Sequence, residues 1–459
     1  MTRGNGTGHN GPASATANDI YFRNLFMKTE FHKWTARFIP LWVGQALSLL
    51  GSQLVQFAII WYLTQTTNSA TTLAIASMMG LLPQVLLSPF IGTWVDRGNR
   101  RLILIAADST VAAATLTLVV LFATGMIQVW HIYVALFIRA VAGGFHQSAF
   151  GASMVLLVPK EQLARVQGFN QALYGGLNII SAPLGAYLLA ILPMQGILGI
   201  DVGTALLAIS MLLFIQIPQP ESQAQTPSTF WQDFRAGFRY IITWRGLVIL
   251  LGLVMVINFF FSATEPLTPL LITNHFNGNA QKLGWWLSSF AAGNILGGLI
   301  LGAWGGFKRK IVTAQLGLIL SGLSTMVVGL VPSDLFWVGL AANTALGLLL
   351  PIINGSFGAT LQATIAPEMQ GRVFAFIFSA AMLVSPIALM VAGPFADTFG
   401  IQRWFLIAGI SCTLMGIFGF FSSDVMTMES ESSKSAPPAM STASPDERPY
   451  SEPYSDSLS

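Results

Sequence analysis

Charged residues are scarce in this chain: Asp, Glu, Lys and Arg make up 9% of its 459 residues, whereas 53% are hydrophobic. A water-soluble globule of this size needs far more polar surface, so the composition excludes a soluble protein. Cysteine is nearly absent too, because Cys412 stands alone, and an intrachain disulfide is therefore excluded. The formal net charge of +3 gives no indication of nucleic-acid binding.

Several catalytic signatures are also missing. No Gly-Lys dipeptide occurs, which excludes the phosphate-binding loop of nucleotide-driven pumps. The five histidines show no metalloprotease spacing, and no nucleophile motif appears. We therefore predict a protein without enzymatic activity, cofactor or bound metal.

Long apolar runs, by contrast, are abundant. Twelve segments reach the length of about 20 residues that a helix needs to cross a bilayer. They are too long, and alternate too little, for a porin-like barrel. We predict an all-α membrane protein whose twelve transmembrane helices form two six-helix bundles. The predicted parts are a cytoplasmic segment 1–36 with a surface helix or an extended first helix, bundles at 37–217 and 247–421, a linker at 218–246, and a disordered tail at 422–459.

The basic residues predict the orientation of these segments. Of the 22 Lys and Arg residues, all but Arg139, Lys282 and Arg403 lie in the tails or in connections on the side of the N-terminus. Lys and Arg near the ends of spans stay in the cytoplasm. We therefore expect both termini to be cytoplasmic.

A repeated motif indicates that one membrane unit is used twice. Residues 92–101 and 302–310 each join two long apolar runs by a short basic turn that contains Gly and Trp. A second pair of similar stretches, 159–166 and 367–373, follows at comparable distances. Two repeated halves of this kind suit a transporter that rocks about a central site.

These features resemble the major facilitator superfamily, and more closely its bacterial drug exporters of the macrolide-efflux type. The resemblance rests on residues 42–49, 89–109, 137–143, 159–162 and 393–397. It implies a monomeric secondary transporter of the bacterial plasma membrane that exports bulky hydrophobic or amphiphilic small molecules by alternating access, in exchange for protons. It also implies a cytoplasmic latch, with membrane anchoring as the simpler alternative, at Gly92, Asp96, Arg97, Arg100 and Arg101.

The resemblance places the first, fourth, seventh and tenth helices around a central cavity, and each of them carries polar residues at helical spacing. The alternative is that these side chains hydrogen-bond between helices. The candidate cavity residues are Gln45, Ser48, Ser52, Gln56, His146, Asn258, Ser262, Asn343 and Asn354.

Ionisable side chains inside spans are costly and mark functional candidates. We expect Glu265 to exchange protons while Arg139 tunes it from the opposite bundle; a static ion pair is the alternative. Asp108 is a second proton candidate, with a bond to a neighbouring helix or to water as the alternative. Asp201 is expected near a water-accessible helix end in a structural role. Pro266 and Pro269 must interrupt backbone hydrogen bonds and predict a bend in the seventh helix that could serve as an outer gate.

Two other functions stay open. Related scaffolds export or flip an endogenous amphiphile such as a siderophore or a lysophospholipid, and the sequence does not separate this from drug export. A membrane sensor or scaffold that transports nothing is the third interpretation, but neither tail is long or apolar enough for a folded cytoplasmic domain.

Overall fold

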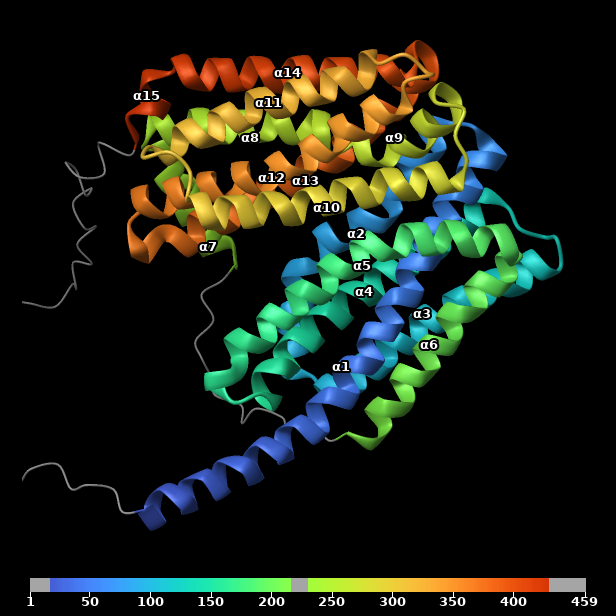
Figure 1. Cartoon of the computed structure of the whole chain (residues 1–459), viewed down its shortest axis with the longest axis vertical. Helices are drawn as coiled ribbons and strands as arrows, with labels where there is room; N and C mark the ends of the chain where they lie inside the picture. The colour runs from blue at the N-terminus through green and yellow to red at the C-terminus, as the bar shows by residue number, and fades with distance from the viewer. Residues whose placement is uncertain (1–16, 216–229, 429–459) are drawn as a thin grey trace, which may run out of the picture.

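The computed structural model describes residues 17–215 and 230–428, and within them the chain is helical with no strand. Twelve helices are long and apolar enough to cross a membrane. They form two bundles that lie side by side (Figure 1). The predicted all-α membrane fold is thus confirmed.

The N-terminal bundle holds the first six spans. Helix α1 packs against α5 and α6, α3 packs against α4 and α6, and α2 packs against α4. Its elements are α1 (Ala17–Thr67), α2 (Ala70–Arg97), α3 (Arg100–Ala123), α4 (Val129–Leu157), η1 (Lys160–Gln162), α5 (Leu163–Ile191) and α6 (Met194–Phe214).

The C-terminal bundle repeats this arrangement. Helix α8 packs against α13 and α14, α11 against α12 and α14, and α10 against α12. Its elements are α8 (Arg245–Phe261), α9 (Thr264–Leu270), the π-helical turn η2 (Leu271–His275), α10 (Ala280–Trp304), α11 (Lys310–Leu330), α12 (Phe336–Thr364), α13 (Pro367–Phe399), α14 (Ile401–Phe421) and α15 (Ser423–Met426).

Short polar caps explain why the long helices begin where they do. The side chains of Ser69, Asn99 and Asn279 accept hydrogen bonds from the backbone N–H three residues on, at the starts of α2, α3 and α10. Such caps satisfy N–H groups that have no partner inside the helix. At the other end of α10, Gly305 adopts φ 75°, a left-handed conformation that favours glycine.

Two predicted boundaries need correction. The chain from Ala17 does not form a separate surface helix, because α1 runs without interruption from Ala17 to Thr67, as the extended-helix alternative proposed. The disordered tail does not begin at 422, because α15 follows and the side chains of Val425 and Met428 are fully buried. Apolar burial against α8 and α14 accounts for this ordered stretch. The rest of both terminal segments lies outside the described residues.

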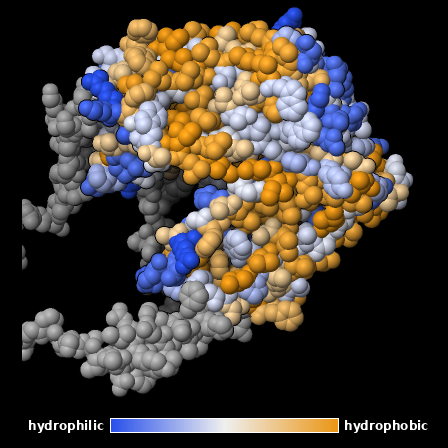
Figure 2. All heavy atoms as spheres, viewed as in Figure 1, coloured by the Kyte–Doolittle hydropathy of each residue, from blue (hydrophilic) through white to orange (hydrophobic). Residues whose placement is uncertain are grey.

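Within the predicted linker, α7 (Phe230–Ile242) is an amphipathic helix that packs on α13 and α8. We call the face of the bundles that carries α7 and the start of α1 the N side, and the other face the opposite side. The two bundles converge on the opposite side and diverge on the N side (Figure 1). The space-filling view shows a hollow between them that opens toward the N side (Figure 2).

Candidate functional site

The main contacts between the two bundles are two helix pairs at the opposite side, α2 with α13 and α5 with α10, and α9 adds smaller contacts with α2 and α1. In the first pair, Asp397 lies in the last turn of α13 and its carboxylate accepts hydrogen bonds from the N-terminus of α2. The backbone N–H groups of Ala70 and Thr71 donate at 2.6 and 3.0 Å, and the Ser69 hydroxyl donates at 3.0 Å. A helix N-terminus carries partial positive charge, so a carboxylate there is stabilising.

Close backbone approach supports this contact. A Cβ on Gly393, one turn before Asp397, would lie 2.8 Å from the Cα of Thr71. In the α5–α10 pair, the Ser288 hydroxyl donates to the carbonyl of Ile179 at 2.6 Å, and a Cβ on Gly284 would lie 3.1 Å from the carbonyl oxygen of Ala182. The opposite side is therefore closed by packed helices.

The basic turn predicted as a latch lies on the N side. Asp96 is the last acidic residue of α2; its side chain is 74% exposed and forms an ion pair of 3.9 Å with Arg100. Asn99, and not Asp96, caps α3. Arg100 donates to the carbonyl of Ala152 on α4, and Arg101 donates to the carbonyl of Leu212 on α6. In this conformation the two arginines join α3 to its own bundle.

Of the other latch residues, Arg97 is exposed at the end of α2, and a Cβ on Gly92 would meet open space. The motif joins the end of α2 to the start of α3, so it lies at the end of the molecule where the two bundles diverge (Figure 1).

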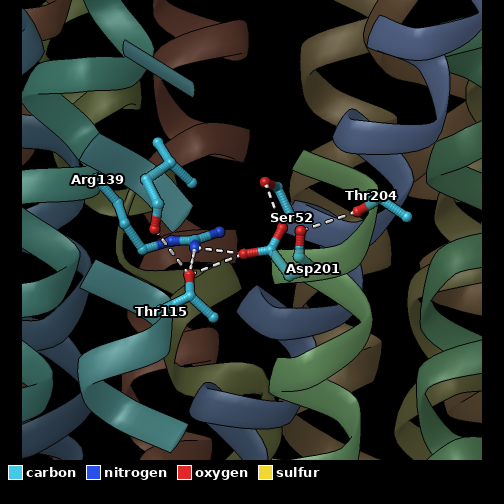
Figure 3. A network of polar contacts seen from close by, with 6 residues as sticks. Ser52, Thr115, Arg139, Asp201 and Thr204 are labelled. Atoms are coloured by element: carbon cyan, nitrogen blue, oxygen red, sulfur yellow. Dashed lines mark hydrogen bonds and ion pairs between the residues drawn. The ribbon is translucent and has the colours of Figure 1, made fainter. Parts of the chain in front are cut away.

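A buried polar network joins helices of the N-terminal bundle (Figure 3). Asp201 on α6 has a fully buried side chain, and Arg139 on α4 approaches it with Nη1 to Oδ2 at 2.6 Å. Thr115 on α3 donates to the same carboxylate oxygen at 2.8 Å and also accepts a hydrogen bond from Arg139. Ser52 on α1 donates to the other oxygen, Oδ1, at 3.0 Å. Four helices are thus joined through one carboxylate.

The predicted approach of Arg139 to Glu265 is therefore wrong for this conformation. Arg139 pairs with Asp201 inside its own bundle, and among the described residues Glu265 forms no ion pair. Asp201 is likewise not at a water-accessible helix end, because its side chain is 0% exposed. A buried guanidinium needs a close carboxylate to offset its desolvation, and Asp201 on the adjacent helix provides one.

A second polar cluster lies nearer the N side, on α1, α3 and α4. Gln45 donates from Nε2 to Asp108 Oδ2 at 3.1 Å, and its Oε1 lies 2.5 Å from Nε2 of His146. The same imidazole nitrogen lies 3.5 Å from Asp108 Oδ1. The bond to a neighbouring helix that was the alternative for Asp108 is present.

Glu265 lies in the interrupted seventh span. Helix α8 ends at Phe261 and α9 begins at Thr264, because Pro266 and Pro269 lack the N–H groups that would bond to the carbonyls of Ser262 and Glu265. The side chain of Glu265 is exposed. Helix α9 packs on α2, α1 and α14, so this residue lies on a segment that contacts both bundles.

The remaining candidates differ in burial and in hydrogen-bond partners. Asn343 is buried and donates to the carbonyl of Trp286 and to Ser289 on α10, so it has the bridging role that was the alternative, as does Ser52. Asn258 donates to the carbonyl of Val254 in its own helix. Gln56 and Asn354 are exposed, Ser262 is half-buried, and Ser48 is buried.

Sequence reasoning missed the role of Asp397 and the partner of Arg139. A signal for Asp397 was present, because an acidic residue in the last turn of a helix opposes that helix's own dipole and needs another partner. No comparable signal distinguished Asp201 from Glu265. Among residues 17–215 and 230–428, no group of three or more His, Cys, Asp and Glu could hold a metal ion.

The model of the Major Facilitator Superfamily matches residues 41–267 and 250–450 of this chain. Macrolide efflux protein A of Streptococcus pyogenes is 34% identical over 381 residues, which are 83% of this chain and 94% of that protein. Macrolide efflux protein A of Enterococcus faecalis is 32% identical over 314 residues, which are 68% of this chain and 97% of that protein.

Among solved structures, the nucleoside transporter NupG has a similar fold, with a TM-score of 0.67 and 11% identity over 84% of this chain and 99% of that one. The sequence matches span both bundles, and the fold match covers the same architecture. The chain therefore belongs to the Major Facilitator Superfamily and is a membrane transport protein, not an enzyme.

Proposed function

We propose that this protein exports bulky hydrophobic or amphiphilic compounds of the macrolide class across the bacterial plasma membrane, in exchange for protons. The observation that carries the proposal is the hollow between two bundles, which opens on the N side and is closed on the opposite side, together with relatives named for macrolide efflux. Substrates of this size need a cavity between domains, where such sites commonly form.

The direction of transport depends on orientation. The distribution of Lys and Arg supports a cytoplasmic N side, and both termini would then be cytoplasmic. The hollow would take up a substrate from the cytoplasm or the inner leaflet. Release would require the contacts of Asp397 with α2 to break while the N side closes, which is alternating access by rocking of two bundles.

Glu265 is the proposed carboxylate of the chamber. It comes from α9, which packs on helices of both bundles, and it is exposed. A carboxylate without an ion partner in a partly dehydrated space can gain and lose a proton as the space opens and closes. In this proposal one chain acts as a monomer, since each bundle supplies one wall of the chamber.

The test is accumulation of a labelled macrolide and of a lipophilic dye in bacteria that express the protein. We expect lower accumulation than in empty cells, and loss of the difference when a protonophore collapses the gradient. Glu265→Gln should abolish the protonophore-sensitive part. The matched control is Glu368→Gln, because Glu368 is exposed at the N-side start of α13.

Equal accumulation in expressing and empty cells for every compound would contradict drug export. It would favour the export or flipping of an endogenous amphiphile, which the same scaffold could perform. If the protein lowered accumulation but the protonophore had no effect, proton exchange would be contradicted and export would not.

A further inference from the structure

Two polar clusters of the N-terminal bundle repeat one arrangement at two depths. Gln45 is seven positions from Ser52 on α1, Asp108 is seven from Thr115 on α3, and His146 is seven from Arg139 on α4. The first residue of each pair belongs to the cluster nearer the N side, and the second belongs to the network around Asp201. Seven residues are about two helical turns, or about 10 Å, and return to the same helix face. The same three helix faces thus meet twice, once around the permanently charged Arg139 and once around His146, which can lose its charge.

When Asp108 is ionised, the hydrogen-bond partners decide which nitrogen of His146 carries a proton. An ionised carboxylate only accepts, so the Gln45 amide nitrogen donates to Asp108 and the Gln45 oxygen faces the imidazole. That oxygen also only accepts, so Nε2 of His146 must donate. In the neutral ring Nδ1 is then the unprotonated nitrogen, and no described group hydrogen-bonds to it.

Exposure indicates where a proton would enter. The His146 side chain is 26% exposed, whereas that of Asp108 is 7% exposed and Gln45 is buried. The imidazole therefore stands between the buried carboxylate and the accessible space. The imidazole also stacks on the ring of Phe150, which lies one helical turn closer to the N side, and the two ring planes are 10° apart.

The charged groups around the cluster come from three helices. The imidazole of His146 faces Asp108 on α3. The nearest charge on α4 is Arg139 and the nearest on α6 is Asp201. These two form an ion pair of 2.6 Å and neutralise each other. Within its span α1 contributes only neutral groups here, and the charges of α2 lie at its N-side end. One uncompensated carboxylate is thus left, and a protonated His146 would complete a neutral pair in a medium where unpaired charge is costly.

We propose that His146, with Asp108 and Gln45, forms a proton-binding site that loads at Nδ1 and is separate from Glu265. The inference rests on the proposed exchange for protons. The site lies two helical turns closer to the N side than Arg139, so its proton would be released toward that side. Asp108 and Gln45 act as positioning residues, because the Gln45 oxygen holds the tautomer and the Asp108 carboxylate lies 3.5 Å from Nε2 of the ring.

The first test uses the purified full-length protein in lipid nanodiscs, with histidine labelled by 15N. Nitrogen chemical shifts distinguish protonated from unprotonated ring nitrogens, and His146→Gln assigns the signal. We expect Nε2–H in the neutral ring and proton uptake at Nδ1 when the pH is lowered over the range in which the protein stays folded. In Asp108→Asn the ratio of charged to neutral His146 at a fixed mildly acidic pH should fall about tenfold or more.

The opposite tautomer, no proton uptake in this range, or an unchanged ratio in Asp108→Asn would overturn the proposal. This experiment requires no transport, so it decides about the site even if macrolides are not exported. Should His146→Gln fail to fold, the conservative Asp108→Asn variant and the remaining histidine signals still give the comparison.

The second test measures efflux of the macrolide or dye from proteoliposomes under an imposed pH gradient. His146→Gln should remove the stimulation by the gradient, and His131→Gln should keep it. His131 is a suitable control because it lies on the same helix, where it completes the cap at the opposite side. Equal stimulation in both variants would refute a coupling role for His146, whereas a wild type without any efflux would refute the proposed function instead.

Discussion

The carboxylate of Asp397, in the last turn of α13, lies 2.6 Å from the backbone nitrogen of Ala70, the first residue of α2 in the other bundle. A residue of one bundle thus caps a helix of the other. The contact can exist only while the opposite side is closed, so its strength contributes directly to the balance between the two open states.

Asp397→Asn should shift this balance toward opening of the opposite side. The amide removes the negative charge and one acceptor oxygen, which together are worth about 1 to 2 kcal/mol at a helix N-terminus, or about 5- to 30-fold in population. Electron-electron distance measurements between spin labels at Gln65 and Gln281, both exposed at the opposite side, would report the change. Asp334→Asn, an exposed acidic residue of the same side, is the control. Identical distance distributions in all three proteins would mean that Asp397 does not stabilise closure.

Gly393→Ala should open the same contact by steric means. The added Cβ would lie 2.8 Å from the Cα of Thr71 and 3.0 Å from the Cβ of Ala74, which is closer than packed carbons allow. We expect larger label separations at the opposite side and reduced efflux. Gly80→Ala on α2 is the matched control, because nothing lies within 4 Å of its added Cβ and alanine favours a helix by about 0.5 to 1 kcal/mol. Unchanged label distances in Gly393→Ala would show that α2 and α13 accommodate the added methyl group without opening the contact.

Removal of one partner from the buried ion pair should destabilise the N-terminal bundle. Asp201→Asn leaves the guanidinium of Arg139 without a countercharge, and such changes cost about 3 to 5 kcal/mol. The double variant Asp201→Asn with Arg139→Gln should recover part of this loss, because no buried charge remains. Thermal unfolding in detergent measures the stability of the wild type and of both variants. Asp96→Asn, whose side chain is 74% exposed, should change stability little. If the double variant were no more stable than Asp201→Asn, the ion pair would not account for the effect.

Two asparagines on α12 separate the bridging role from the cavity role. Asn343→Ala removes two hydrogen bonds to α10 and should lower stability by about 1 to 3 kcal/mol. Asn354→Ala should leave stability unchanged and alter the apparent affinity for exported compounds, because its side chain is exposed. Thermal unfolding and concentration-dependent efflux, measured on both variants, would show whether the two effects separate in this way. A stability loss of equal size in both would contradict the distinction.

Much of the architecture could be predicted because it depends on local composition. The length of an apolar run decides whether a helix can span a bilayer, and the missing N–H groups of Pro266 and Pro269 interrupt the seventh span wherever its neighbours lie. The repeated motif likewise gave the two bundles. These features follow from the chain itself, since lipid forces backbone hydrogen bonds to be satisfied within each helix.

The partners of the buried charges were decided by tertiary structure alone. Depth along a helix can be estimated from the sequence, because each residue of a helix adds about 1.5 Å. Which carboxylate Arg139 meets depends instead on the rotation of each helix and on how closely neighbours approach, as at Gly51, where a Cβ would collide with Thr204 beside Asp201. The sequence by itself therefore determined the spans, their breaks and the duplication, whereas helix packing decided that Arg139 serves the scaffold, that His146 faces Asp108, and that Asp397 joins the bundles.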